Sequence, residues 1–200
     1  GDSMITTAEL AAKEQQAEKK GISKDLLMDR AGEEIAAIIH RGGWKKVLFV
    51  CYQGNNGGDG FCAARKLLDT CTVHILFVGQ EEKLKAEAKK NYQELKRLER
   101  KTGKDIFISQ PKEGTFDLVV DALLGTGSQK RELKEPLISA VNLINRGKFI
   151  ISIDTPTGIN PDTGEKAKLF VVPDLIITIH DIKPGLVPYQ KLTTVIDIGL

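Results

Sequence analysis

The sequence predicts an α/β protein with a doubly wound, Rossmann-like, mainly parallel sheet and helices on both faces. The first observation is that short β-branched runs alternate with longer helical patterns along the chain. This alternation produces parallel strands joined by right-handed crossovers. The second is that two of the runs, residues 46–51 and 149–153, are almost entirely apolar. Strands of this kind are buried between helices on both sides of a parallel sheet.

Two helices are expected before the first strand. Thr6-Thr7-Ala8-Glu9 has the S/T-x-x-E form of a capping box, which satisfies two amides at the start of a helix. Gly21 is expected to end this helix, because glycine readily adopts the left-handed backbone of a helix C-terminus. Ser23 can cap a second helix that runs to about residue 40.

Strands and further helices then alternate. Short β-branched runs predict strands at residues 46–51, 72–78, 116–121, 149–153, 175–179 and 194–198. Helical patterns between these strands cover residues 61–69, 81–100 and 136–145. The helix at 81–100 mixes many Lys and Arg residues with several Glu residues. This mixture indicates a solvated helix face rather than a surface for nucleic acid.

The composition favours a single domain over residues 1–200, because 41% of the residues are hydrophobic and no linker or repeat interrupts the chain. The 29 Lys and Arg residues nearly balance the 27 Asp and Glu residues, which leaves a net charge of +2. This charge gives no reason to expect nucleic acid or an anionic membrane as a partner. The apolar runs are far shorter than the roughly 18 residues that a membrane span needs.

The N-terminus and the cysteines indicate an intracellular protein. Residues 1–3 are interpreted as the remnant of a cleaved tag, so that the native protein begins at Met4. This N-terminus has neither the basic start nor the apolar stretch of a signal peptide. Cys51, Cys62 and Cys71 are odd in number and lack the close pairing of a zinc site. We therefore expect reduced thiols and a cytoplasmic location.

A glycine-rich segment, Gly-Asn-Asn-Gly-Gly-Asp-Gly at residues 54–60, follows the first strand. Ligands of open α/β sheets bind beyond the carboxyl ends of the strands, so this position favours a binding site. Glycines let backbone amides approach a ligand, and the start of the next helix attracts phosphate. The alternative is a tight turn capped by Asp59, but a turn needs fewer such residues. The segment is neither a Walker A motif nor a dinucleotide fingerprint, which disfavours ordinary NAD-dependent hydride transfer.

Two further segments follow strands in the same way. Asp121 begins a segment at 121–128 whose glycines leave amides free for phosphate. Lys130 and Arg131 behind it add positive charge, or else form an exposed basic turn. Asp154 emerges from an apolar strand, where partial desolvation suits a carboxyl group to acid–base work, and a turn-capping role is the alternative.

Three oxygen donors from neighbouring strand ends are expected to meet at this edge of the sheet. They are the amide of Asn56, the carboxylate of Asp121 and the hydroxyl of Thr157. Hard oxygen donors with only one firm negative charge suit a monovalent cation or a water cluster better than zinc. Potassium is the cation that we expect here.

Three motifs stand in a characteristic order: Gly-Asn-Asn-Gly-Gly-Asp-Gly at 54–60, Asp-Ala-Leu-Leu-Gly-Thr-Gly at 121–127 and Ile-Asp-Thr-Pro-Thr-Gly at 153–158. Lys-Pro-Gly-Leu at 183–186 and Asp-Ile-Gly-Leu at 197–200 follow them. Through the order and spacing of these motifs, the sequence resembles the NAD(P)H-hydrate epimerase family, the YjeF N-terminal domain. The resemblance extends over essentially the whole chain.

The resemblance implies an isomerase that interconverts the R and S forms of NADH and NADPH hydrated at C6 of the nicotinamide ring. This is a metabolite-repair reaction that feeds an S-specific dehydratase, either separate or fused. The resemblance also implies potassium bound by Asn56, Asp121 and Thr157. Neither nucleic acid nor a membrane is implied as a partner, and a homodimer is allowed. The implied contacts to the hydrated dinucleotide are Asn55, Asn56, Gly57, Gly58, Asp59, Gly125, Thr126, Gly127, Ser128, Gln129, Lys130, Arg131 and Asp154.

Inversion at C6 requires this carbon to become planar, either by ring opening or by loss and return of water. Both routes need a proton donor and a proton acceptor. We assign the catalytic role to Asp154, while Asp59 orients the ribose or assists. The alternative is a non-catalytic nucleotide-binding or scaffold module of the same fold. Such a module would lack the carboxylates, and the presence of Asp59, Asp121 and Asp154 favours the enzyme.

Overall fold

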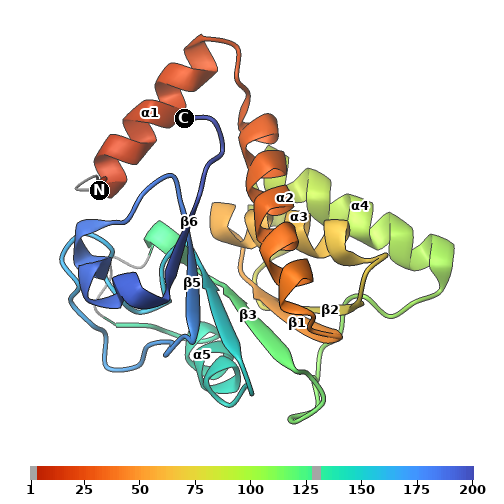
Figure 1. The fold of residues 1–200 in the computed structure, drawn as a ribbon. Helices are drawn as coiled ribbons and strands as arrows, with labels where there is room; N and C mark the ends of the chain where they lie inside the picture. Colours follow the sequence, from red (N-terminus) through yellow and green to blue (C-terminus); the bar gives the residue numbers. More distant parts are fainter. Residues whose placement is uncertain (1–3, 128–131) are drawn as a thin grey trace.

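The computed structural model describes residues 4–127 and 132–200. Within these residues six strands form one sheet in the order β2-β1-β3-β4-β5-β6, and all neighbours are parallel (Figure 1). The strands are β1 Lys46–Cys51, β2 Thr72–Phe77, β3 Leu118–Ala122, β4 Ile150–Ile153, β5 Leu175–Ile179 and β6 Thr193–Ile196. The predicted fold class is therefore confirmed, and each strand end lies within two residues of its predicted position.

Helices cover both faces of the sheet (Figure 1). One face packs against α2 Lys24–Gly42, α3 Asn55–Leu67 and α4 Ala86–Thr102, and the other against α5 Leu137–Asn145. Alternate residues of β1 enter the two cores: Phe49 lies on the α2–α4 side, and Leu48 on the α5 side. This double burial explains why β1 is almost continuously apolar.

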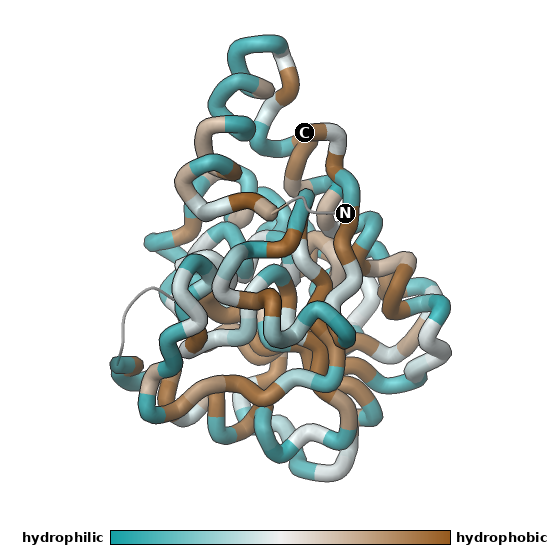
Figure 2. Tube along the Cα trace, turned by 60° about the vertical axis from the view of Figure 1, so that its left-hand side comes forward, coloured by the Kyte–Doolittle hydropathy of each residue, from teal (hydrophilic) through white to brown (hydrophobic). Residues whose placement is uncertain are grey.

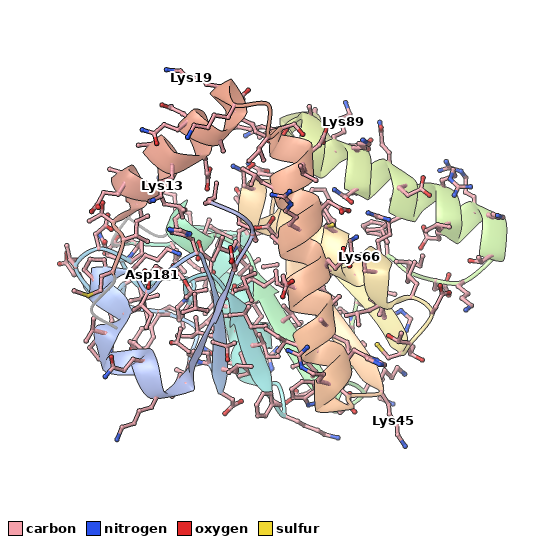
Figure 3. All side chains as sticks on the ribbon, turned by 45° about the horizontal axis from the view of Figure 1, so that its top comes forward. Lys13, Lys19, Lys45, Lys66, Lys89 and Asp181 are labelled. Atoms are coloured by element: carbon pink, nitrogen blue, oxygen red, sulfur yellow. The ribbon has the colours of Figure 1, made fainter. Side chains whose placement is uncertain are left out.

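The surface of the molecule is mainly polar around the junction of the first two helices. Figure 2 shows mainly hydrophilic residues at the top of the view, where the first two helices meet, and hydrophobic segments inside. On the outer side of the helix layer, Lys66 of α3 pairs with Asp29 of α2 at 2.9 Å (Figure 3). No helix within residues 4–127 and 132–200 is both long and apolar enough to cross a membrane.

The first helix, α1 Thr7–Lys19, begins with the predicted capping box. The Thr6 hydroxyl accepts a hydrogen bond from the Glu9 amide at 3.1 Å. The helix start is also tied to a distant loop, because the amide and hydroxyl of Thr7 donate to the Asp162 carboxylate at 3.0 and 2.7 Å. Beyond this anchored end α1 stands apart from the sheet, beside the C-terminus (Figure 1).

Two predicted helices differ from the observed ones. The helix after β1 begins at Asn55 rather than residue 61, so the glycine-rich segment forms its first turns. A Cβ on Gly57 would overlap the carbonyl oxygen of Tyr52, and glycine therefore lets α3 start immediately against the strand end. The helix predicted at 81–100 is divided into a short 3-10 turn, η1 Glu81–Lys83, and α4, because Leu84 between them is extended and buried in the core.

The remaining connections are short 3-10 segments and irregular loops. They include η2 Gly125–Gly127 after β3 and η3 Pro184–Leu192 between β5 and β6. The sheet order places β2 and β3 on opposite sides of β1. The chain therefore leaves the carboxyl ends of β1 and β3 in opposite directions, and this switch point is where open α/β sheets bind ligands.

Candidate active site

A cleft of about 380 Å³ lies at the switch point, between the carboxyl ends of the strands and α1. Loops after β1, β3 and β4 form its floor, and the inner face of α1 forms one wall. The residues that line it are Leu10, Glu14, Tyr52, Gln53, Gly54, Asn55, Asn56, Asp59, Leu123, Leu124, Thr126, Gly127, Asp154 and Ile179. All three segments predicted from the sequence to bind a ligand contribute to this cleft.

The N-terminus of α3 borders the cleft. The helix begins after Gly54, and no side chain caps its first amides. Uncapped amides and the helix dipole give this end a partial positive charge, which attracts phosphate. Thr126 and Gly127 also line the cleft. Ser128, Gln129, Lys130 and Arg131, predicted contacts of the dinucleotide, lie outside the described residues.

Two predicted contact residues serve packing as well as the site. A Cβ on Gly58 would collide with Met28 and Ala88, so this glycine brings α3 close to α2 and α4. Gly125 has a φ of 55° and its Cα faces the Asn56 side-chain amide, so a larger residue would displace that amide. Both glycines are therefore needed to place α3 at the cleft.

Two of the three predicted cation donors, Asp121 and Thr157, are in direct contact. The Asp121 carboxylate is fully buried and accepts hydrogen bonds from the Thr157 hydroxyl at 2.8 Å and the Thr157 amide at 2.9 Å. It also accepts from the Ser152 hydroxyl at 2.8 Å. The buried Asn56 amide donates to the carbonyl oxygen of Ile153, the last residue of β4, at 2.9 Å. The ends of β3 and β4 and the start of α3 are thus linked by these side chains.

This donor set has the chemistry of a site for a monovalent cation. Within the described residues, the buried Oδ1 of Asn56 has no hydrogen-bond partner. Burial raises the pKa of the Asp121 carboxyl, although hydrogen bonds from Thr157 and Ser152 oppose that effect. A cation here would offset the buried negative charge and occupy the free amide oxygen. Among the described residues no three His, Cys, Asp or Glu side chains gather into a metal-binding group of the zinc kind.

Asp154 occupies a strained position at the end of β4. Its φ is 67°, in the left-handed region that few residues other than glycine adopt. The Thr155 amide donates to the Ile153 carbonyl at 2.9 Å, so Asp154 is the central residue of a γ-turn of the rare kind. Strain of this sort is found where the surrounding structure holds a functional side chain in place.

A buried lysine holds the Asp154 carboxylate. Lys183 has no exposed surface, and its ammonium donates to Oδ1 of Asp154 at 2.6 Å. The same oxygen accepts from the Thr178 hydroxyl at 3.0 Å and the Ile179 amide at 3.1 Å. Sequence reasoning noted Lys183 only as part of a motif and missed this ion pair. The available signal was a lysine in a Lys-Pro-Gly segment shortly after the end of β5.

Carboxylates from three elements also line the cleft. Asp59 is 8% exposed and faces the cleft from the second turn of α3, while Glu14 reaches the same space from α1. Burial is the main cause that raises the pKa of Asp59 well above its usual range, and the charges of Asp154 and Glu14 raise it further. Burial and then the Asp154 charge also raise the pKa of Glu14. Sequence reasoning missed Glu14, because nothing in a helix of mixed polarity marks one of its carboxylates.

The comparisons with known proteins concern this same part of the chain. A family model described as YjeF-related protein N-terminus matches residues 24–185. A relative from Methanopyrus kandleri, named bifunctional NAD(P)H-hydrate repair enzyme Nnr, is 39% identical over 90% of this chain and 38% of its own length. A relative from Nitrosopumilus maritimus, named NAD(P)H-hydrate epimerase, is 31% identical over 94% of this chain and 90% of its own length.

The relatives thus differ in length. The chain spans only about two fifths of the bifunctional relatives, 38% in one case and 41% in one from Archaeoglobus fulgidus. Among solved structures, the crystal structure of the yeast protein ynu0 matches with a TM-score of 0.72 and 24% identity, over 98% of this chain and 88% of that one. This likeness shows the fold alone. Residues 24–185 contain all the cleft residues except Leu10 and Glu14, which α1 contributes.

Proposed function

The chain belongs to the family of YjeF-related protein N-termini, and on that premise we propose that it is an epimerase of hydrated NADH and NADPH. It interconverts the R and S forms at C6 of the nicotinamide ring. A relative of similar length is named as an epimerase of this substrate. The observation that carries the proposal is one cleft that joins the uncapped start of α3 to the carboxyl groups of Asp59 and Asp154.

The cleft offers different groups to the two parts of such a substrate. The diphosphate binds at the start of α3, with Asn55, Thr126 and Gly127 around it, because helix amides attract anions. The carboxyl groups of Glu14, Asp59 and Asp154 repel phosphate and receive the hydrated ring, which is uncharged and carries hydrogen-bond donors. The ring carbon to be inverted then lies near Asp59 and Asp154.

Asp154 and Asp59 supply the proton transfers that inversion needs. Lys183 holds Oδ1 of Asp154 at 2.6 Å and so positions this carboxylate to accept the proton of the C6 hydroxyl. Asp59 faces the same cleft, and its raised pKa suits it to donate a proton. In ring opening, the O–H electron pair forms the C6 carbonyl, the C6–N1 pair moves to nitrogen, and nitrogen takes the proton. Rotation about C5–C6 and the reverse steps give the other epimer.

We also propose a potassium ion held by Asn56, Asp121 and Thr157. When bound, the ion would add positive charge beneath the cleft and fix the strand ends that carry the site. The free Asn56 oxygen and the buried Asp121 charge support this proposal.

Replacing Thr157 by Val is expected to abolish a potassium-dependent rise in melting temperature. The substitution keeps the shape of the side chain and removes one oxygen ligand. The measurement compares melting in potassium chloride and in choline chloride of equal ionic strength. Thr194→Val is the matched control, because Thr194 is an exposed residue of β6, two strands away from β4, and this variant should keep the potassium response. An unchanged potassium response in Thr157→Val would remove this hydroxyl from the ligand set.

The proposed partner in repair is an S-specific dehydratase, whether separate or fused as the name of the longer relatives indicates. The epimerase is tested by adding this chain to a mixture of R- and S-hydrates that such a dehydratase has already exhausted of the S form. We expect NADH absorbance to rise again, until the R form is consumed as well. Persistence of the R-hydrate, together with tight binding of it, would favour the non-catalytic module. Light scattering of this chain alone, without the dehydratase, tests whether it forms a homodimer.

A further inference from the structure

Glu14 is a cleft residue that lies outside the part of the chain matched by the family model, residues 24–185. We propose that Glu14 is a specificity-determining residue whose carboxylate accepts a hydrogen bond from the C6 hydroxyl of the hydrated ring. This inference rests on the proposed function, and it adds a residue that distinguishes the hydrated ring from the unhydrated one. The unhydrated dihydronicotinamide ring lacks that hydroxyl, so a contact to it separates substrate from the abundant parent cofactor.

The start of α1 is anchored firmly enough to place Glu14. The capping box fixes the first turn, and Thr7 donates twice to Asp162. The Ile5 amide donates to the Ile182 carbonyl at 3.0 Å just before the helix. Leu10 is buried and lines the cleft, and Glu14 follows it by four residues on the same helix face. Glu14 is therefore directed into the cleft, whereas Lys19 at the far end of α1 points outward (Figure 3).

The Glu14 carboxylate is an acceptor that the described residues leave without a hydrogen bond or an ion pair. The positive charges that act on Glu14 are those of Lys183 and Lys24, and both act through space. Lys183 is already engaged by Asp154, Thr178 and the Ile179 carbonyl. Glu14 is half-buried, so a donor from a ligand would replace part of the hydration that this carboxylate has lost.

The two epimers themselves require acceptors on two sides of the ring. Their C6 hydroxyls project from opposite ring faces, so a second acceptor lets the closed ring of either epimer keep a hydrogen bond to its hydroxyl, while Asp154 remains the base that takes the proton. Asp154 approaches the cleft from the end of β4, and Glu14 approaches it from α1, which stands apart from the sheet (Figure 1). Asp59 lies on α3 and provides the proton that both directions share. Glu14 thus supplies a hydrogen-bond acceptor on the ring face that points away from the sheet.

The test measures affinity for two ligands, an equilibrated mixture of NADH hydrates and NADH itself, by calorimetry on the whole chain. Glu14→Gln is expected to weaken hydrate binding roughly 10-fold or more, the effect of losing a hydrogen bond to a charged group. Its affinity for NADH should stay within about twofold. Glu14→Asp, which keeps the charge, should restore part of the preference. Glu34→Gln removes an exposed carboxylate from α2 and serves as the matched control.

The outcomes separate this inference from the proposed function. Equal losses of affinity for both ligands, or no loss for either, would overturn the role of Glu14. So would a wild-type protein that binds hydrate no better than NADH. Selective loss of hydrate affinity in a protein that shows no epimerisation would instead reject the proposed function and leave the assignment of Glu14 in place.

Discussion

Asp154→Asn is expected to lower the free energy of unfolding by about 3–5 kcal/mol and the rate of epimerisation by about 10²–10⁴-fold. The stability is lost because Lys183 has no exposed surface, and its ammonium would then be buried without a counter-charge. The rate is lost because an amide cannot accept the hydroxyl proton. Urea unfolding and initial rates of epimerisation measure the two effects separately.

A second variant keeps this prediction independent of misfolding. In Asp154→Asn/Lys183→Met both charges are gone, so much of the lost stability should return while activity stays low. This double variant separates the proton-accepting role of Asp154 from its role in the ion pair. If Asp154→Asn alone unfolds at the same urea concentration as the wild type, the pair at 2.6 Å does not stabilise the fold.

Gly57→Ala is expected to lower the free energy of unfolding by about 3 kcal/mol, at the upper end of overpacking effects. The added Cβ would overlap the carbonyl oxygen of Tyr52, a backbone atom that cannot rotate away. The start of α3 would have to move from the end of β1, and the phosphate-binding amides would move with it. Dinucleotide affinity should therefore fall together with stability.

Gly54→Ala, three residues earlier, is the matched control for this prediction. An added Cβ at Gly54 has no atom within 4 Å, and the backbone there has a negative φ. Calorimetric melting and dinucleotide titration of the two variants should differ clearly. If the two variants are equally stable, the start of α3 can shift without cost. The need for glycine at position 57 would then not come from close contact with the end of β1.

The sequence was informative where a local pattern determines the structure. The bounds of β1 and β5 were predicted to the residue, because apolar β-branched runs end abruptly at polar or glycine-rich segments. The capping box at Thr6 was confirmed for the same reason, since all its partners lie within one helical turn. The strand ends also placed Asp121 and Thr157 correctly in contact, because carboxyl ends of parallel strands share one edge.

Features that depend on tertiary packing could not be predicted. The start of α3 was placed six residues too late, because a segment with four glycines has low helix propensity and its helix is favoured only by contact with β1. Asp154 and Lys183 are 29 residues apart, and their pairing depends on the γ-turn after β4. Glu14 reaches the cleft only because α1 is anchored through Asp162.

The most direct test of the account is to watch the inversion at C6 without any coupling enzyme. Purified R-hydrate and purified S-hydrate of NADH are incubated separately with this chain in potassium buffer, and proton NMR follows the hydrogen on C6. We expect both samples to reach one common ratio of epimers, at a rate proportional to protein concentration and far above that of the protein-free buffer. Each epimer changing only at its protein-free rate would contradict the assignment of this cleft as an epimerase site.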